Sequence, residues 1–471
     1  MDARRIAPLL RATWRPSTLF WACVVLVWGL LFVFWLKNYG QELLSHAGGS
    51  LSYVEAARHL YYDRLFSVGE VSETGALLST SRFPPVYPFM LFSSFLVFGD
   101  TTLALDVVRF MTWCMAIGVV YFTYRIGRLW GPGLGYAAAL LAALDVYMIS
   151  VAMNYDTPDF VAAFFSTMGI FYLMRYLKAQ QFISGVLLSA LWLGVGTWTK
   201  VSVYLLWVPL LFILALYLLR NGALSRRTKL LHVGIFFAIV FAFFGGWKVR
   251  NWYVVGTSSF SSQSGEVMLQ YHAAHTLARI RGVSNLEIEQ EMAAVLPPNA
   301  AERASVAEKS DYQYAVGRRI VLDHPFTYLV VKLLDVPSLL FGTLPPYYFF
   351  PKGRVEDIIR GFTSGAITGH RTLLPALWSE GRYLYVAIYW LLKVFMLALL
   401  GFACIGVMRM LRNRSDRWML SVLLAVVLYV VFVSTPVATP RYRPPLMPML
   451  YVLAAYGGSF LWTFRLRRRV L

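Results

Sequence analysis

The feature that most constrains this chain is its repeated apolar runs, which match the thickness of a lipid bilayer. About 20 consecutive apolar residues are needed for a helix to cross the hydrocarbon core, and residues 18–36, 107–124, 135–151 and 160–177 are close to that length. Of the 471 residues, 58% are hydrophobic and only 14% are charged, whereas a soluble protein carries roughly 25% charged residues. The sequence therefore predicts an all-α polytopic membrane protein.

The strongly positive charge is arranged in clusters at the ends of these apolar segments. The net charge of +19 would suggest a nucleic-acid partner in a soluble protein. Here the clusters, such as "RNGALSRRTK" and "RLRRRVL", are better explained by the retention of Lys and Arg in cytoplasmic loops. About ten crossings with both termini in the cytoplasm place every cluster inside, and no nucleic-acid partner is expected.

The chain divides into three parts. Residues 1–250 form an N-terminal transmembrane module, whose first outer loop (about 37–106) contains "RFPPVYPFMLFSSFLVFG"; its apolar part is short and follows prolines, so it predicts an interfacial helix. Residues 251–382 form an extracytoplasmic or interfacial region with one or two polar helices, a Pro-Pro break and an amphipathic helix. Residues 383–471 form the C-terminal transmembrane helices.

Charged residues gather on the predicted outer face, where positive-inside bias should deplete arginine. A charge at a membrane boundary is often only an anchor, but outer-leaflet arginines need an anionic partner, and a lipid phosphate is the natural one. The residues concerned are Glu55, Asp63 and Arg82 in the first loop, Asp156 and Asp159 in "NYDTPD", Lys248 and Arg250 in "WKVRNW", and Arg441 and Arg443 in "RYRPP".

Two histidines in "YHAAH" stand three residues apart, a spacing that suits a metal site on a helix. No third ligand accompanies His272 and His275, so the sequence favours a pair of surface histidines and predicts no metal site.

The order of several weak motifs gives the chain a family resemblance. The pieces are "GGSLSYVEAARHL", "RFPPVYP", "NYDTPDF", "GTWTK", "GGWKVRNWYVVGTSSFSSQSG" and "PRYRPPLMPMLYVLAA". Together they resemble the GT-C glycosyltransferases, in the branch of the lipid A aminoarabinose transferase and the protein O-mannosyltransferases. The resemblance implies a GT-C helical bundle in a bacterial cytoplasmic (inner) membrane, with its active site on the extracytoplasmic face.

The resemblance also implies an activity. The chain would be an inverting glycosyltransferase that moves a sugar from a polyprenyl-phosphate carrier to an extracytoplasmic glycan, lipid or protein. Membrane lipids would surround it. No cofactor is required, since arginines can neutralise the phosphate, although a divalent cation would be compatible with this chemistry.

The resemblance assigns roles to residues at the outer face. Basic side chains would bind the carrier phosphate and stabilise the charge that builds on it as the glycosidic bond breaks. Tyrosines would line a sugar pocket. The phosphate ligands would be Arg82, Arg250, Arg441, Arg443 and Lys200, and the pocket tyrosines Tyr53, Tyr87 and Tyr442.

The catalytic base is where this sequence departs from the family. The family has an aspartate three or four residues before the tyrosine that Tyr53 matches, but Gly49 and Ser50 stand there. Three explanations remain open: Asp156 or Asp159 is the base; a first-loop group such as Glu55, Asp63 or His46 replaces it; or the chain does not catalyse transfer. Asp159 could equally cap the helix that follows it.

Two other functions compete with the enzyme. A transporter or flippase of lipid-linked sugars would show internal repeats or helices broken by Gly and Pro in both halves, and the sequence shows neither. A noncatalytic protein that binds a carrier lipid would explain the missing aspartate.

Overall fold

The computed structural model describes residues 16–39, 48–71, 75–154, 157–179, 183–295, 305–342, 383–437 and 440–468. This part of the chain is almost entirely helical and contains no strand, so the predicted all-α fold is confirmed. Six of the described helices are long and apolar enough to cross a membrane, and four shorter apolar helices accompany them. The predicted count of about ten crossings stays a prediction.

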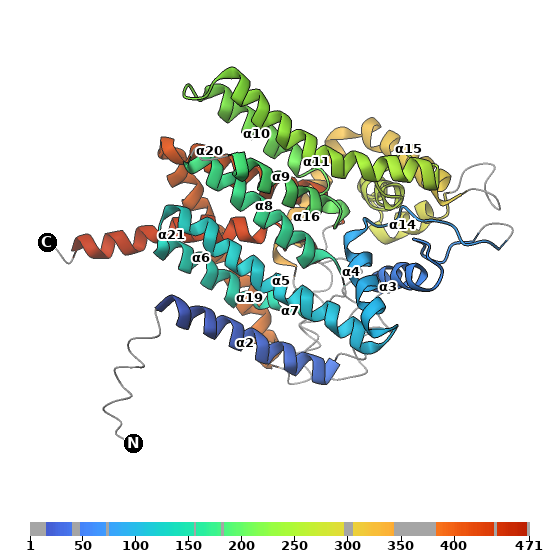
Figure 1. Ribbon diagram of the computed structural model, residues 1–471, viewed down its shortest axis with the longest axis horizontal. Helices are drawn as coiled ribbons and strands as arrows, with labels where there is room; N and C mark the ends of the chain where they lie inside the picture. Colours follow the sequence, from blue (N-terminus) through green and yellow to red (C-terminus); the bar gives the residue numbers. More distant parts are fainter. Residues whose placement is uncertain are drawn as a thin grey trace.

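The apolar helices pack into one bundle (Figure 1), in which α5 contacts α6 and α8, α9 contacts α8 and α11, and α21 contacts α6 and α19. Its helices are α2 (Pro16–Tyr39), α5 (Thr102–Gly127), α6 (Pro132–Leu144), α7 (Val146–Asn154), α8 (Asp159–Ala179), α9 (Ile183–Thr197), α10 (Trp207–Arg220), α11 (Arg226–Val255), α19 (Tyr383–Arg412), α20 (Arg417–Ser434) and α21 (Met447–Arg468).

The contact between α19 and α21 depends on two glycines. A Cβ added to Gly406 would lie 2.1 Å from the Leu453 carbonyl oxygen, and one added to Gly457 would lie 2.0 Å from that of Phe402. Helix backbones approach this closely in membranes where small residues line the contact. Any side chain at either glycine would push these two helices apart.

A break at Asp145 divides one apolar segment that the sequence predicts as continuous. The Asp145 carboxylate accepts hydrogen bonds from the amides of Tyr147 and Met148, at 3.0 and 3.2 Å, and from the Tyr451 hydroxyl at 2.6 Å. An aspartate that binds the amides just after it starts a new helix. Residues 135–151 therefore form most of α6 and most of α7, and the break is tied to α21.

The shorter helices gather at one end of the bundle, which we call the site end. In Figure 1, α3, α4, α14 and α15 lie at the right, whereas α2 begins and α21 ends at the left. The helices of the site end are α3 (Gly48–Tyr62), α4 (Val86–Phe98), α12 (Gln263–Glu266), the π-helix η4 (Val267–Ala273), α13 (Ala274–Arg281), α14 (Asn285–Ala293), α15 (Val306–Asp323) and α16 (Pro325–Phe341).

The sequence explains the shape of these elements. With 13 residues, α4 is too short to span a bilayer, as expected for the predicted interfacial helix. The predicted polar helices correspond to α14 and α15, which begin at the side-chain caps Ser284 and Ser305. The side of the membrane on which the site end lies stays a prediction, as do the three domain boundaries.

Candidate functional site

A buried ion pair joins the start of α8 to the end of α9 at the site end. The Lys200 ammonium donates to Oδ1 of Asp159, and the Thr157 hydroxyl donates to Oδ2 at 2.6 Å. Asp159 is 2% exposed and Lys200 is 9% exposed. Both oxygens of this carboxylate are therefore engaged, and its charge is balanced by a single ammonium group.

A second cation faces the same place from the short 3₁₀ turn η7 (Pro440–Tyr442). The Tyr442 ring lies 4.3 Å from the Lys200 ammonium, and Arg441 donates to the Tyr442 hydroxyl at 3.4 Å. Burial alone would raise the pKa of Tyr442, but Arg441 and Lys200 outweigh it, so this pKa lies below its usual value. The electrostatic potential at this phenol is therefore positive.

Tyr53 of α3 brings the first loop to this group. Its ring stacks on Phe83 at 4.0 Å. Burial raises the pKa of Tyr53, Asp159 raises it further, and Arg441 and Arg82 oppose the rise. These three charged groups therefore lie within electrostatic range of one hydroxyl.

We call Arg82, Lys200 and Arg441 the cationic cluster, since all three act electrostatically, with Asp159, on the hydroxyl of Tyr53 or Tyr442. Arg82 lies just before α4, where its Nη2 donates to Oε2 of Glu266 at 3.2 Å. Its Nε is buried and has no hydrogen-bond partner among the described residues. Three cations face two carboxylates here, Asp159 and Glu266, and the net positive charge of the group suits an anionic ligand.

The other two predicted phosphate ligands are bound to backbone carbonyls. Arg250 of α11 donates to the Thr80 carbonyl at 2.6 Å and lies over the Trp247 ring. Arg443 is 2% exposed and donates to the carbonyls of Leu340 and Gly342, each at 2.6 Å. The structure thus separates Arg443, which fixes the end of α16, from its neighbour Arg441.

The remaining predicted site residues lie apart or outside the description. Tyr87 is 2% exposed and packs edge-on against Tyr53. Glu55 and Asp63 are exposed, and Asp63 pairs with His59 at 2.7 Å. Asp156 and His46 lie outside the described residues, so their predicted roles stay predictions. Gly49 lies in α3 one turn before Tyr53, which puts both on the same helix face.

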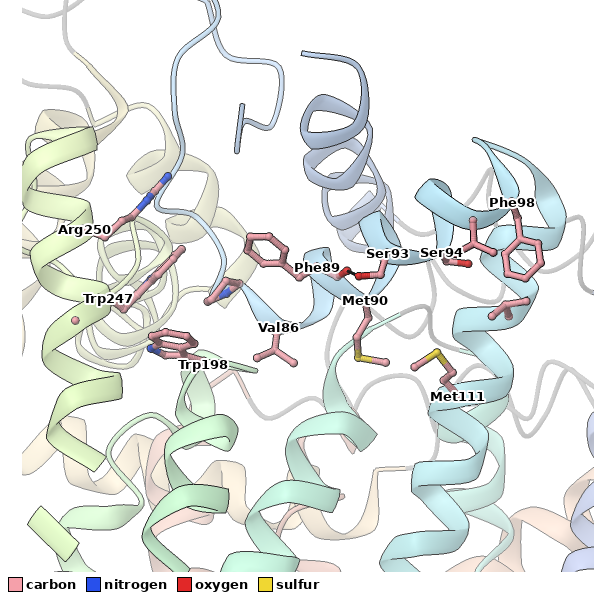
Figure 2. A pocket seen from close by; sticks show the side chains of 14 residues that line it. Val86, Phe89, Met90, Ser93, Ser94, Phe98, Met111, Trp198, Trp247 and Arg250 are labelled. Atoms are coloured by element: carbon pink, nitrogen blue, oxygen red, sulfur yellow. Dashed lines mark hydrogen bonds between the residues drawn. The ribbon is translucent and has the colours of Figure 1, made fainter. Parts of the chain in front are cut away.

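An apolar groove of 820 Å³ opens at the site end, between α4, α5, Trp198 and α11. Figure 2 shows Phe89 and Met90 of α4 above it, Met111 of α5 at one side, and Trp198 and Trp247 below Arg250 at the other. The wall residues are Pro85, Val86, Phe89, Met90, Ser93, Ser94, Val97, Phe98, Val107, Met111, Trp198, Gly246, Trp247 and Arg250.

The groove and the cationic cluster share two segments of chain. The Val86 amide donates to the Trp198 carbonyl at 3.0 Å, so the start of α4 and the end of α9 meet at the groove wall. Arg82 lies four residues before Val86, and Lys200 two residues after Trp198. The two segments that line one wall of the groove therefore also carry two of the three cations.

Two parts of this end were not foreseen. Glu266 directly follows "SSFSSQSG" in the sequence. Its place next to a motif of the family resemblance was the one sequence feature that could have pointed to it as a site residue.

The prediction of surface histidines at positions 272 and 275 is wrong, because they are 9% and 8% exposed. His272 bonds Tyr328 at 2.7 Å, and His275 bonds Glu289 at 2.7 Å. No group of three or more metal-binding side chains occurs in the described residues.

Comparison with known proteins supports the fold. Residues 82–247, which include Arg82, Asp159 and Lys200, match the family model described as dolichyl-phosphate-mannose-protein mannosyltransferase. No curated protein sequence matches the chain.

Solved structures give the same result. The archaeal oligosaccharyltransferase AglB from Archaeoglobus fulgidus, in complex with an inhibitory peptide and a dolichol-phosphate, is 10% identical and superposes at a TM-score of 0.50 over 96% of this chain and 52% of that chain. The apo oligosaccharyltransferase of Archaeoglobus fulgidus is 13% identical, with a TM-score of 0.52 over 96% of this chain and 51% of that one. This chain thus spans about half the length of those enzymes.

ArnT from Cupriavidus metallidurans bound to undecaprenyl phosphate is 16% identical, covering 94% of this chain and 77% of that chain, with a TM-score of 0.37; no conclusion rests on this superposition. The mannosyltransferase match and the shared fold confirm the predicted resemblance to the GT-C glycosyltransferases.

Proposed function

We propose that this chain transfers a sugar from a polyprenyl-phosphate carrier to an acceptor outside a bacterial cytoplasmic membrane, with inversion at the anomeric carbon. The observation that carries the proposal is the apolar groove of 820 Å³, whose wall residues Val86 and Trp198 stand a few residues along the chain from Arg82 and Lys200. A polyprenyl phosphate has the same two parts, a long apolar stem and an anionic head. Ligand sites of this size commonly combine apolar walls with a few placed polar groups.

The carrier's stem lies in the groove, against Phe89, Met90, Trp198 and Trp247. Its phosphate then reaches the cationic cluster, where Arg82 still has an unused Nε–H. As the glycosidic bond breaks, the bonding electron pair goes to the phosphate oxygen, and nearby fixed cations stabilise this charge more in the transition state than in the ground state.

Asp159 has a positioning role in this mechanism. Its carboxylate holds the Lys200 ammonium in place and limits the net charge of the cluster before the donor binds. An uncompensated buried ammonium would be costly. Because both of its oxygens are already engaged, Asp159 is poorly arranged to accept a proton from an acceptor.

The comparisons support this class of donor. The matched family model carries dolichyl-phosphate-mannose in its description, and the AglB structure holds a dolichol-phosphate together with a peptide. These similarities do not identify which sugar this chain transfers or which acceptor receives it. Polyprenyl phosphates with different sugars are therefore the donors to test first.

The experiment uses the full chain in lipid nanodiscs with a panel of undecaprenyl-phosphate sugars carrying a radiolabel. Acceptors come from an extract of envelope lipids and glycans. Wild-type protein should release undecaprenyl phosphate and label an acceptor, and Arg82→Gln and Arg441→Gln should each lower the rate about 100-fold or more. Arg318→Gln, an exposed charge on α15, is the matched control. Equal rates for all four proteins would contradict the proposal.

One observation favours a second function, the binding of a carrier lipid without turnover. Gly49 and Ser50 stand four and three residues before Tyr53 in α3, where the family that the sequence resembles has its aspartate. Undecaprenyl phosphate that binds to wild-type protein, and more weakly to Arg441→Gln, without any sugar transfer would establish this alternative.

A further inference from the structure

The carboxylates near the cationic cluster differ in their access to an acceptor. Asp159 is buried and its two oxygens are occupied. Glu55 is exposed and lies two residues after Tyr53, so it projects from another face of α3. Glu266 contacts Arg82 and is still open to solvent.

We propose that Glu266 is the catalytic base of this site, the carboxylate that takes the proton from the acceptor hydroxyl. The inference rests on the proposed function and answers the question that Gly49 and Ser50 raise. It moves the base from the first loop to the segment between α11 and η4.

The contacts of Glu266 suit this role. Its Oε2 lies 3.2 Å from Nη2 of Arg82, and the side chains of Arg82 and Glu266 are 33% and 37% exposed. Among the described residues nothing donates a hydrogen bond to Oε1 of Glu266. One oxygen therefore orients the carboxylate on the phosphate-binding arginine, while the other can receive a proton.

The segment that carries Glu266 is fixed to the segment that carries Arg82. The Ser262 amide donates to the Ser81 carbonyl at 3.2 Å, and the Ser261 hydroxyl donates to the Arg82 carbonyl at 2.6 Å. A base must be held within hydrogen-bond reach of the proton that it removes. The two hydrogen bonds between these segments keep Glu266 at a constant distance from Arg82.

Close packing holds the other side of Glu266. A Cβ on Gly265 would lie 2.1 Å from the Ser310 carbonyl oxygen, so α12 lies directly against the backbone of α15. The Ser310 hydroxyl also donates to the Ser262 carbonyl at 2.7 Å. Glu266 is thus built into a rigid junction rather than carried on a free loop.

Electrostatics place Glu266 at the same site as Arg441. Burial raises the pKa of Tyr271, Glu289 and Glu266 raise it further, and Arg441 opposes the rise. The phenol of Tyr271 therefore senses both the proposed base and a cation of the cluster. Of these two carboxylates, Glu289 is bonded to His275. Glu266 is the one that pairs with a cation of the cluster, Arg82.

The step balances without another reactant. The acceptor oxygen forms a bond to the anomeric carbon, the bond from that carbon to the carrier phosphate breaks, and the phosphate keeps the electron pair. The proton of the acceptor hydroxyl goes to Oε1 of Glu266 and from there to solvent. Arg82 contacts the leaving phosphate through Nε and the base through Nη2, so it sets their spacing.

The test compares Glu266→Gln with Glu266→Asp and Glu70→Gln in nanodiscs. Glu70 is a suitable control because it is a second carboxylate close enough to Arg82 for that arginine to lower its pKa, although burial raises this pKa more. No hydrogen bond joins the side chains of Glu70 and Arg82. We measure kcat with the active undecaprenyl-phosphate sugar, its pH dependence, and binding of undecaprenyl phosphate by native mass spectrometry.

We expect Glu266→Gln to lower kcat about 100-fold or more while it binds undecaprenyl phosphate at least as well as wild type. The fall of the wild-type rate at acid pH should disappear in this variant, Glu266→Asp should restore part of the rate, and Glu70→Gln should match wild type.

A Glu266→Gln variant with undiminished kcat overturns the inference, most clearly if Asp156→Asn is inactive. Parallel loss of binding and rate would show a structural role, which also overturns it. Wild-type protein without any transfer would instead overturn the proposed function, and this inference with it.

Discussion

The Lys200 ammonium donates a hydrogen bond to the Asp159 carboxylate across 41 residues of sequence, and both side chains are almost fully buried. This pair connects the beginning of α8 with the turn after α9. The same ammonium lies 4.3 Å from the ring of Tyr442, so the pair also joins these helices to the segment before α21. Lys200 therefore stabilises the contact between these segments, and we propose that the same ammonium group also binds the carrier phosphate.

Removal of one member of this pair should destabilise the protein strongly. Asp159→Asn leaves a buried ammonium, and Lys200→Met leaves a buried carboxylate, so each should lower the free energy of unfolding by about 3–5 kcal/mol. The double variant should lose less than the sum, because no charge is left unpaired. Denaturant unfolding of the protein in detergent micelles measures all three. Additive losses would show that the two charges do not interact.

The groove can be filled at a position that tolerates a side chain. Gly246 lines the groove, and a Cβ added to it meets no atom within 4 Å. Gly246→Leu should therefore keep the fold and weaken binding of undecaprenyl phosphate about tenfold or more, equivalent to about 1.4 kcal/mol. Gly234→Leu is the control, since Gly234 lies on the same helix, also has free space and does not line the groove. Equal binding by both variants would place the stem elsewhere.

The ion pairs of His275 predict a stability contribution that depends on pH. Burial alone would lower the pKa of His275, but Asp335 and Glu289 outweigh it and raise the pKa from 6.5 to about 9. Because the folded state binds this proton more tightly, the stabilisation is complete below about pH 6.5 and is lost as the pH rises through about 9. For this buried side chain it amounts to about 3 kcal/mol.

His275→Gln isolates this contribution. The stability gap between wild type and variant should be widest near pH 6 and close above pH 9, as followed by thermal unfolding in detergent. Tyr271, His272 and Lys332 also titrate near this group, but they are present in both proteins and largely cancel in the difference. A gap that is the same at every pH would mean that the pKa of His275 is the same in the folded and unfolded protein, which would contradict this prediction.

The helical fold could be predicted from the sequence because membrane solvation acts locally. Apolar length and basic flanks determine which segments are bundle helices, whatever their neighbours are. The break at Asp145 was missed because it depends on a hydrogen bond to Tyr451, about 300 residues away. Chain order alone could not show that contact.

The site was only partly predictable for the same reason. Residue type and position near a helix end suggested Arg82 and Arg441 as cations at one place, and the family resemblance added Lys200. Sequence could not separate Arg441 from Arg443, which stand two residues apart and differ only in what the fold places next to them. Glu266 was missed because its importance lies in a contact with Arg82 across 184 residues.

Arg441 and Arg443 provide the last prediction, since they make different contacts in the structure. Arg443→Gln removes charged donors from the buried carbonyls of Leu340 and Gly342. Each such hydrogen bond contributes about 1.5–3 kcal/mol, so this variant should unfold at a clearly lower temperature. Arg441 is half-buried, and Arg441→Gln should lower the unfolding temperature less than Arg443→Gln does.

Ligand binding should show the reverse order. Arg441→Gln should weaken binding of undecaprenyl phosphate about tenfold or more, because it removes a charged contact to the phosphate, whereas folded Arg443→Gln should bind like wild type. Unfolding temperature and native mass spectrometry on the same two preparations measure both properties. If Arg443→Gln loses binding without losing stability, then Arg443 rather than Arg441 contacts the phosphate, and the anion site lies nearer to the end of α16 than the cationic cluster does.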